Sequence, residues 1–88
     1  MARALTIHRE VVALRNRVQY FERLRAKIAY YTAAKCRFWV FEEISLPGAF
    51  VEFTEADDAQ TLASAHASAP WRLLDPGRIY HQVEVATK

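Results

Sequence analysis

Two groups of side chains in this sequence could do chemistry. The first contains His66, on the apolar stripe of a predicted helix, His81, on the helix-facing side of a predicted strand, and Tyr31, near the end of an earlier helix. Imidazole nitrogens bind metals and haem iron, so the two histidines would form a ligand pocket if they lay close together. The alternative is that each histidine is partly buried and satisfied by one hydrogen bond. We favour this alternative, because no acid at helix-ligand spacing accompanies the pair, and we predict no metal and no cofactor.

The second group contains His8, Glu52 and Glu84, which we place on one face of the predicted sheet. A histidine beside a carboxylate can act as a general base. The same side chains could instead form ion pairs in a subunit interface, and we favour that interpretation. Cys36 has no partner cysteine, and the chain lacks a glycine-rich phosphate loop, a CxxC pair and an HExxH motif. The sequence therefore leaves open whether the protein is an enzyme.

The elements that must position these side chains follow from hydrophobic periodicity. Alternation of period two predicts strands over residues 4–11, 36–44, 49–54 and 78–86. Spacings of three and four predict a long helix that begins near Arg17, and a shorter helix with Thr54 as its N-cap. This β-α-β-β-α-β order predicts an α+β, ferredoxin-like fold over residues 1–88, in which two helices cover one face of a four-stranded antiparallel sheet.

Details of the helices and of one loop can also be predicted. The long helix should bury one stripe, made of Leu14, Val18, Phe21, Leu24, Ile28 and Tyr31. Asn16 and Gln19 resemble a capping box at its start. Residues 70–78 should form a loop that packs against the body of the protein, because Trp71, Leu73 and Leu74 are apolar.

The alternation also divides the sheet into two faces. We assign to the helices the face with Leu5, Ile7, Ala49, Val51, Phe53, Val83 and Val85. The other face then carries Thr6, His8, Trp39, Phe41, Phe50, Glu52, Tyr80, Gln82 and Glu84. Its aromatic side chains form a patch that soluble monomers seldom expose. We expect a second copy of the chain to cover this patch, with contacts from His8, Trp39, Phe41, Phe50, Glu52, Tyr80 and Glu84.

Single-stranded nucleic acid is the other candidate for this face. The stretch AFVEF at residues 49–53 resembles the end of the base-binding strand of RNA-recognition motifs. That motif requires a basic residue and an aromatic residue where this chain has Leu46 and Gly48. Residues 37–69, which carry most of the aromatic side chains of this face, have one basic and six acidic residues. Because phosphate binding requires positive potential, we do not expect nucleic acid as the partner.

The pattern as a whole resembles the dimeric α/β-barrel superfamily, which includes antibiotic-biosynthesis-type monooxygenases and stress-responsive barrel proteins. The similarity covers residues 4–86 and consists of the order of elements, the long first helix and the tight hairpin turn. It implies a homodimer whose sheets face each other, and a pocket for an apolar or aromatic small molecule between sheet and helices. It also implies cofactor-independent monooxygenase-like chemistry if the protein is an enzyme. The alternative is a non-catalytic dimeric assembly module, and no catalytic residues can be assigned from the resemblance.

Composition agrees with a small globular domain. The chain has 88 residues, of which 52% are hydrophobic, with a net charge of +2. A domain of this size buries a limited core, so a subunit partner would add stability. There is one cysteine and no apolar run of membrane-spanning length. We therefore expect a cytoplasmic protein.

Overall fold

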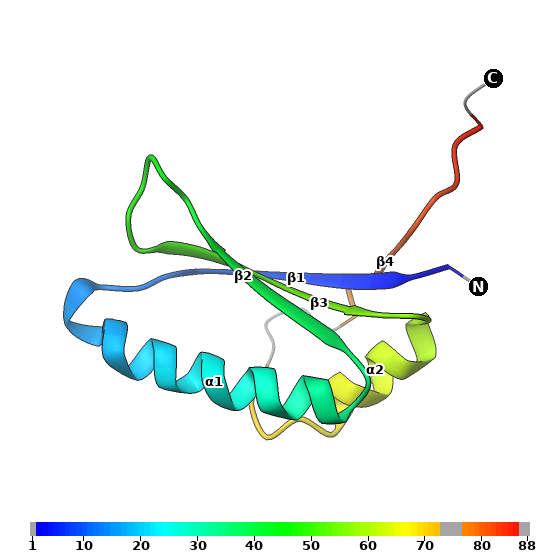
Figure 1. The fold of residues 1–88 in the computed structure, drawn as a ribbon, viewed down its shortest axis with the longest axis horizontal. Coiled ribbons are helices and arrows are strands. Elements are labelled where there is room, and N and C mark those ends of the chain that lie inside the picture. The colour runs from blue at the N-terminus through cyan, green and yellow to red at the C-terminus, as the bar shows by residue number, and fades with distance from the viewer. Residues whose placement is uncertain (1, 73–76, 87–88) are drawn as a thin grey trace.

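The structure is a computed structural model that describes residues 2–72 and 77–86. The elements in chain order are β1 (Ala4–Val11), a 3₁₀ turn (Leu14–Asn16), α1 (Arg17–Ala33), β2 (Arg37–Glu42), β3 (Ala49–Ala56), α2 (Ala59–Ala67) and β4 (Tyr80–His81). The strands form one antiparallel sheet in the order β2-β3-β1-β4. Both helices lie on the same side of this sheet (Figure 1). The predicted α+β fold with its ferredoxin-like arrangement is therefore confirmed.

The hairpin between β2 and β3 turns at Gly48, which follows Pro47. Gly48 has a positive φ of 97°, a conformation that side chains other than glycine's rarely adopt. A Cβ atom there would lie 2.8 Å from the carbonyl oxygen of Val12. The Gly48 carbonyl in turn accepts a hydrogen bond of 2.7 Å from the Val12 N–H. Glycine at this position thus joins the hairpin to the end of β1.

Helix α1 begins at Arg17, as predicted, but the proposed capping box is wrong. The Asn16 side chain makes no capping hydrogen bond, and a 3₁₀ turn leads into the helix instead. Arg17 anchors the start of the helix through two hydrogen bonds to the Glu42 carboxylate, at 2.9 and 3.0 Å. These bonds, together with the Gly48 N–H, lower the pKa of Glu42 to about 2.

The buried stripe of α1 differs from the predicted one. The helix buries Tyr20, Leu24 and Tyr31, whereas Val18 and Ile28 are exposed. The spacing of four and seven is again helical, but the stripe includes Tyr20, whose hydroxyl donates a hydrogen bond to Glu52 on the sheet. Among the described residues, neither helix has the length and apolar character needed to span a bilayer.

Helix α2 starts later than predicted, because β3 continues through Thr54 to Ala56. Its N-cap is Asp58, whose carboxylate accepts a hydrogen bond of 2.7 Å from the Thr61 N–H. This bond favours the charged carboxylate and lowers the pKa of Asp58. The prediction of Thr54 as the cap is therefore wrong.

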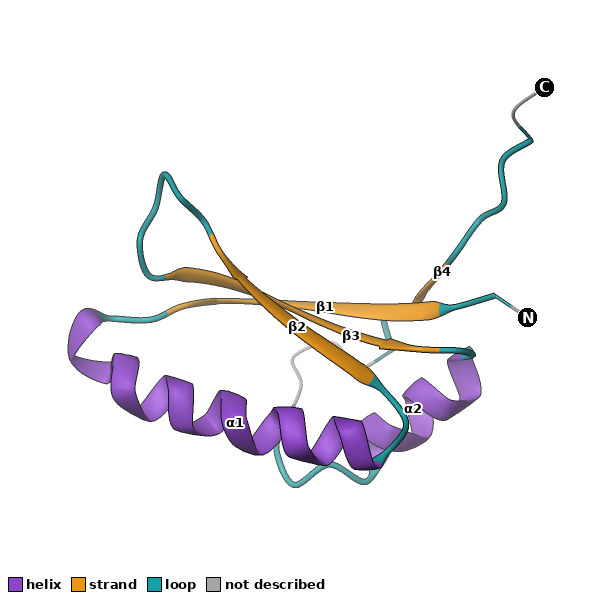
Figure 2. Ribbon diagram, viewed as in Figure 1, coloured by secondary structure: helices purple, strands orange, loops and turns teal. Residues whose placement is uncertain are grey.

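The assignment of the two sheet faces is inverted for β1 and β3. Thr6, Phe50, Glu52 and Thr54 lie on the side that the helices cover, and all four are buried. Ile7 lies on the open side and is 48% exposed. Two sets of side chains, one apolar and one largely polar, alternate along these strands, and the helices cover the polar set. Figure 2 shows that no element covers the other side of the sheet among the described residues.

The last strand is shorter than predicted. Ala4 lies opposite His81 and Leu5 opposite Tyr80, and the Gln82 N–H donates to the Arg3 carbonyl. In this register, the residues after Gln82 extend past the start of β1. They therefore have no strand to pair with. Residues 83–86 are accordingly exposed and point away from the sheet in Figure 1.

The core consists of two clusters beneath the sheet. One surrounds Tyr31 and Leu62, and the other surrounds Tyr20 and Phe50. Trp71 packs edge-on against Tyr30, with ring centroids 5.2 Å apart, which agrees with the predicted packing of the loop. Leu73 and Leu74, predicted to pack in the same way, lie outside the described residues.

Candidate ligand-binding site

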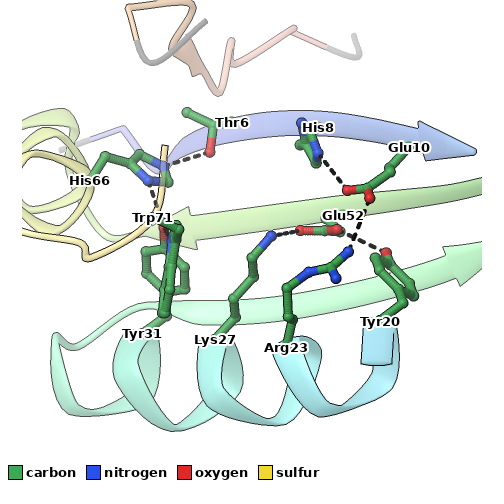
Figure 3. A network of polar contacts seen from close by, with 10 residues as sticks. All are labelled: Thr6, His8, Glu10, Tyr20, Arg23, Lys27, Tyr31, Glu52, His66 and Trp71. Atoms are coloured by element: carbon green, nitrogen blue, oxygen red, sulfur yellow. Dashed lines mark hydrogen bonds and ion pairs between the residues drawn. The ribbon is translucent and has the colours of Figure 1, made fainter. Parts of the chain in front are cut away.

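The covered face of the sheet carries a buried carboxylate, Glu52, at the centre of β3. Glu52 is 3% exposed. One of its oxygens accepts a hydrogen bond of 2.8 Å from the Tyr20 hydroxyl, and the other forms an ion pair of 2.8 Å with Lys27 Nζ. Both partners project from α1 toward the strand (Figure 3). Burial, and then the bond to Glu52, raise the pKa of Tyr20 well above its ordinary value, so this phenol stays protonated.

A second polar cluster surrounds His66 on α2. Its Nε2 lies 2.8 Å from the Thr6 hydroxyl, and its Nδ1 lies 2.9 Å from the Tyr31 hydroxyl. The indole N–H of Trp71 donates to the same Tyr31 hydroxyl at 3.0 Å. Side chains from β1, α1, α2 and the loop after α2 thus meet at one point (Figure 3).

The donors fix the protonation of this cluster. Since Trp71 can only donate, the Tyr31 oxygen acts as acceptor toward it, and its own hydrogen needs another acceptor. His66 Nδ1 is that acceptor, which leaves the ring hydrogen on Nε2, donating to Thr6. Burial also lowers the pKa of His66 and raises that of Tyr31, so both side chains are neutral.

We expect the neutral state of His66 to make stability depend on pH. The pKa of His66 is lower in the folded chain than its ordinary value of 6.5, so the unfolded chain binds more protons below that value. The stabilising contribution is complete above about pH 6.5 and is lost as the pH falls below it, by at most about 1.4 kcal/mol per pH unit.

Urea unfolding at pH values from 5 to 8 measures this dependence. The variant H66Q, which retains a donor and an acceptor, should flatten the slope between pH 5 and pH 6.5. H81Q, which replaces an exposed histidine, serves as the control and should keep the wild-type slope. An unchanged slope in H66Q would contradict the assignment.

The third cluster lies on β1 beside Glu52. His8 is directly opposite Glu52 in the strand register, and its Nε2 lies 3.3 Å from Glu10 Oε1. Arg23 donates to the other oxygen of Glu10 at 3.1 Å. His8, Glu10 and Glu52 could each offer a metal-ligand atom, all within 4.8 Å of one another. Each carboxylate is already paired with a basic side chain from α1, however, so we assign no metal here.

The clusters adjoin two cavities that share lining residues. A small cavity of about 20 Å³, enough for one water molecule, is lined by residues that include Thr6, Glu52 and His66. A larger, open cavity of about 550 Å³ lies between β1, α1 and the loop after α2. His8, Lys27, Trp71 and Arg72 line both cavities. The buried polar clusters are therefore next to a space of ligand size.

The structure brings some predicted site residues together and separates others. His66 and Tyr31, which the sequence analysis grouped as pocket candidates, are in direct contact. His81 does not join them, because it is exposed on β4 and lines a separate cavity with Arg3 and Glu55. Glu84 does not approach His8, because the register of β4 carries it past the start of β1.

The predicted subunit contacts also divide. Trp39, Phe41 and Tyr80 lie on the open face, where their role as contacts stays a prediction. Phe50, Glu52 and His8 lie on the covered face, so placing them in the open-face group was wrong. On the covered face Phe50 and Glu52 pack against α1, which supplies the aromatic and basic residues that contact them.

Sequence reasoning missed four residues of the site, namely Thr6, Tyr20, Lys27 and Trp71. The sequence contains part of the pattern that could have identified these residues. Spacings of three and four, as in the predicted apolar stripe, also join Tyr20, Leu24, Lys27 and Tyr31. A lysine within such a stripe indicates a buried acid opposite, and Glu52 is the acid that the helix meets. No local pattern predicts the contact of Trp71 with Tyr31, since 40 residues separate them.

Comparisons of the chain with protein-family models, with curated proteins and with solved structures found no match.

Proposed function

We propose that the chain is a homodimeric small-molecule-binding protein of the dimeric α/β-barrel type. The observation that carries the binding role is the open cavity of about 550 Å³ beside the buried polar clusters. Ligand sites are typically concave, of this size, and lined by apolar surface with a few convergent polar groups. Monooxygenase-like chemistry, implied by the resemblance, stays a prediction.

The cavity lining combines apolar and charged groups. Trp71, Ala26 and Val11 supply apolar surface, and the other six lining residues are polar or charged. Among these, His8 and Lys27 are held in place by hydrogen bonds. The Trp71 ring is fixed by its bond to Tyr31 and by its contact with Tyr30. A preorganised wall of this kind lowers the entropic cost of binding an aromatic molecule.

A panel of aromatic ligands tests the binding role. We expect bicyclic aromatic compounds to raise the melting temperature of the wild-type protein, because they bind only the folded state. The ligand-induced shift should fall in W71L, which removes the cavity wall. It should persist in W39L, the matched control on the open face. A flat response in the wild-type protein would reject the binding role and favour the assembly module.

The dimeric state is supported by the open face of the sheet. Trp39 is 45% exposed and Phe41 is 60% exposed, and Phe41 packs edge-on against Phe53 across the strands. Together with Ile7 and Val51, these side chains supply apolar surface to a face that no described element covers. Monomeric proteins seldom leave such a surface in contact with water.

Charge favours a second copy over nucleic acid as the occupant. The basic side chains of this face are already paired: Arg9 with Glu43, and both Arg3 and Arg37 with Glu55. A phosphate chain would find no uncompensated positive charge in these pairs. Paired charges around an apolar centre suit an isologous contact, in which the same patch meets itself across a two-fold axis.

Phe41→Glu tests the dimer. A carboxylate at the centre of the apolar face would be buried without a partner in the dimer, so we expect the dissociation constant to rise by 100-fold or more. Sedimentation velocity from nanomolar to micromolar concentration measures this change, and Ile44→Glu, at an exposed position in the hairpin loop, is the control. A monomeric wild-type protein at micromolar concentration would contradict the proposal, as would a dimer that survives F41E.

A further inference from the structure

We propose that the open cavity binds an aromatic carboxylic acid, with the ring against Trp71 and the carboxylate held by Arg72 and Lys27. This proposal rests on the proposed binding role and names its ligand class. It follows from the charge of the lining, from the donors that remain free there, and from the orientation of the aromatic wall.

The lining of the cavity is predominantly basic. Glu10 is its one acidic residue among the described residues, whereas the basic side chains are Arg9, Arg23, Lys27 and Arg72. Each of the first three is ion-paired, with Glu43, Glu10 and Glu52 respectively, so Arg72 supplies the uncompensated positive charge. Low-dielectric walls concentrate the field of such a charge inside a cleft. The cavity therefore favours an anion over a neutral or cationic ligand.

The ion pairs of these residues leave donors available. Lys27 uses one N–H bond toward Glu52, and Arg23 uses one toward Glu10. Ammonium has three donors and guanidinium has five, so a ligand carboxylate can be bound without breaking either pair. Arg72 makes no hydrogen bond or ion pair with any described residue. Its guanidinium fork can therefore bind a carboxylate with two parallel hydrogen bonds.

The apolar wall of the cavity favours a flat ring. Trp71 directs its one polar group inward to Tyr31, so its indole ring meets the cavity as apolar surface. Ala26 and Val11 are the other apolar lining residues. Offset stacking or edge-to-face packing on the indole requires an aromatic partner. Ring and carboxylate together define an aromatic acid.

Matched probes test this ligand class. The dissociation constants of 2-naphthoate, its neutral analogue 2-naphthamide and ring-free acetate can be measured by isothermal titration calorimetry. We expect naphthoate to bind at least tenfold tighter than naphthamide, because hydrogen bonds to charged groups are the stronger ones. This preference should shrink as the salt concentration rises, and acetate should bind far more weakly than naphthoate.

Charge-neutral variants locate the carboxylate. R72M should reduce the preference for the acid to within about threefold while leaving naphthamide binding unchanged. R25M removes the same charge from an exposed position on α1 outside the cavity lining, and it should retain the preference. If R72M and R25M lose the preference for the acid to the same extent, the assignment of Arg72 is overturned.

The outcomes separate the ligand class from the binding role. If naphthamide binds as tightly as naphthoate to the wild-type protein, the acid preference is wrong and the aromatic pocket stands. If neither naphthalene compound binds, the binding role itself fails, and the ligand class with it.

Discussion

Replacing Phe50 by Ala is expected to destabilise the fold by about 3–5 kcal/mol. Phe50 is 3% exposed, and its ring lies 4.7 Å from that of Tyr20 and 5.9 Å from that of Phe21. The Arg17 guanidinium lies over the same ring at 5.2 Å. Truncation removes all these contacts and leaves a cavity at the centre of one core cluster. Urea or thermal unfolding followed by circular dichroism measures the loss.

Phe41→Ala is the matched control, because the two phenylalanines lie on opposite faces of the sheet. At a protein concentration low enough for the chain to be monomeric, F41A should cost less than about 1 kcal/mol, since Phe41 is largely exposed. Equal destabilisation by the two variants would mean that both rings occupy the same face, as the sequence alone suggested.

Glu52→Gln is expected to cost a similar amount, about 3–5 kcal/mol. The amide oxygen can still accept a hydrogen bond from the Tyr20 hydroxyl. Lys27 Nζ, however, loses its counter-charge, and the Lys27 side chain is only 15% exposed. An unpaired ammonium in this position is costly, because burial removes most of its water. Denaturant titration at pH 7 measures the change in the free energy of unfolding.

Two further variants isolate the cause. E43Q breaks the exposed ion pair with Arg9 and should cost at most about 1 kcal/mol. The double variant K27M/E52Q removes the stranded cation and should be more stable than E52Q alone. If K27M/E52Q is less stable than E52Q, the loss does not come from an unpaired lysine.

The two faces of the sheet have unusual roles. The covered face holds Glu52 and Thr6, and their polar groups are satisfied by side chains from the two helices. No buried side-chain nitrogen or oxygen among the described residues lacks a partner. The open face holds Trp39 and Phe41. The proposed dimer uses the open side of the sheet, whereas the proposed ligand pocket lies beside α1 and also borders Arg9 and Val11 of β1.

Local sequence was sufficient for most of the elements. β1 spans the residues that its alternation indicated, α1 starts at Arg17 as expected, and Gly48 turns the hairpin. Such features depend on neighbouring residues, so periodicity and backbone preferences predict them. The boundary of α2 was missed because two capping residues, Thr54 and Asp58, were available, and strand pairing extended β3 past the first.

The candidate site was predicted less completely. His66 and Tyr31 were identified and do meet, since both lie on helical stripes that face the sheet. His81 was grouped with them on strand alternation alone. The short pairing of β4 with β1 decides its position, and no local pattern encodes where that pairing stops.

By itself, the sequence determined the order of the elements, the antiparallel four-stranded sheet and the groups of residues that share a face of β1, β2 and β3. Only the tertiary structure decided which group the helices cover. Alternation has the same period on both faces of a strand. It therefore shows which residues share a face, but not which face is buried. The choice depended on partners distant in the chain: Tyr20 and Lys27 for Glu52, and His66 for Thr6. Because a buried polar group must be paired, these contacts allow the polar face to lie under the helices, and the apolar face is left open.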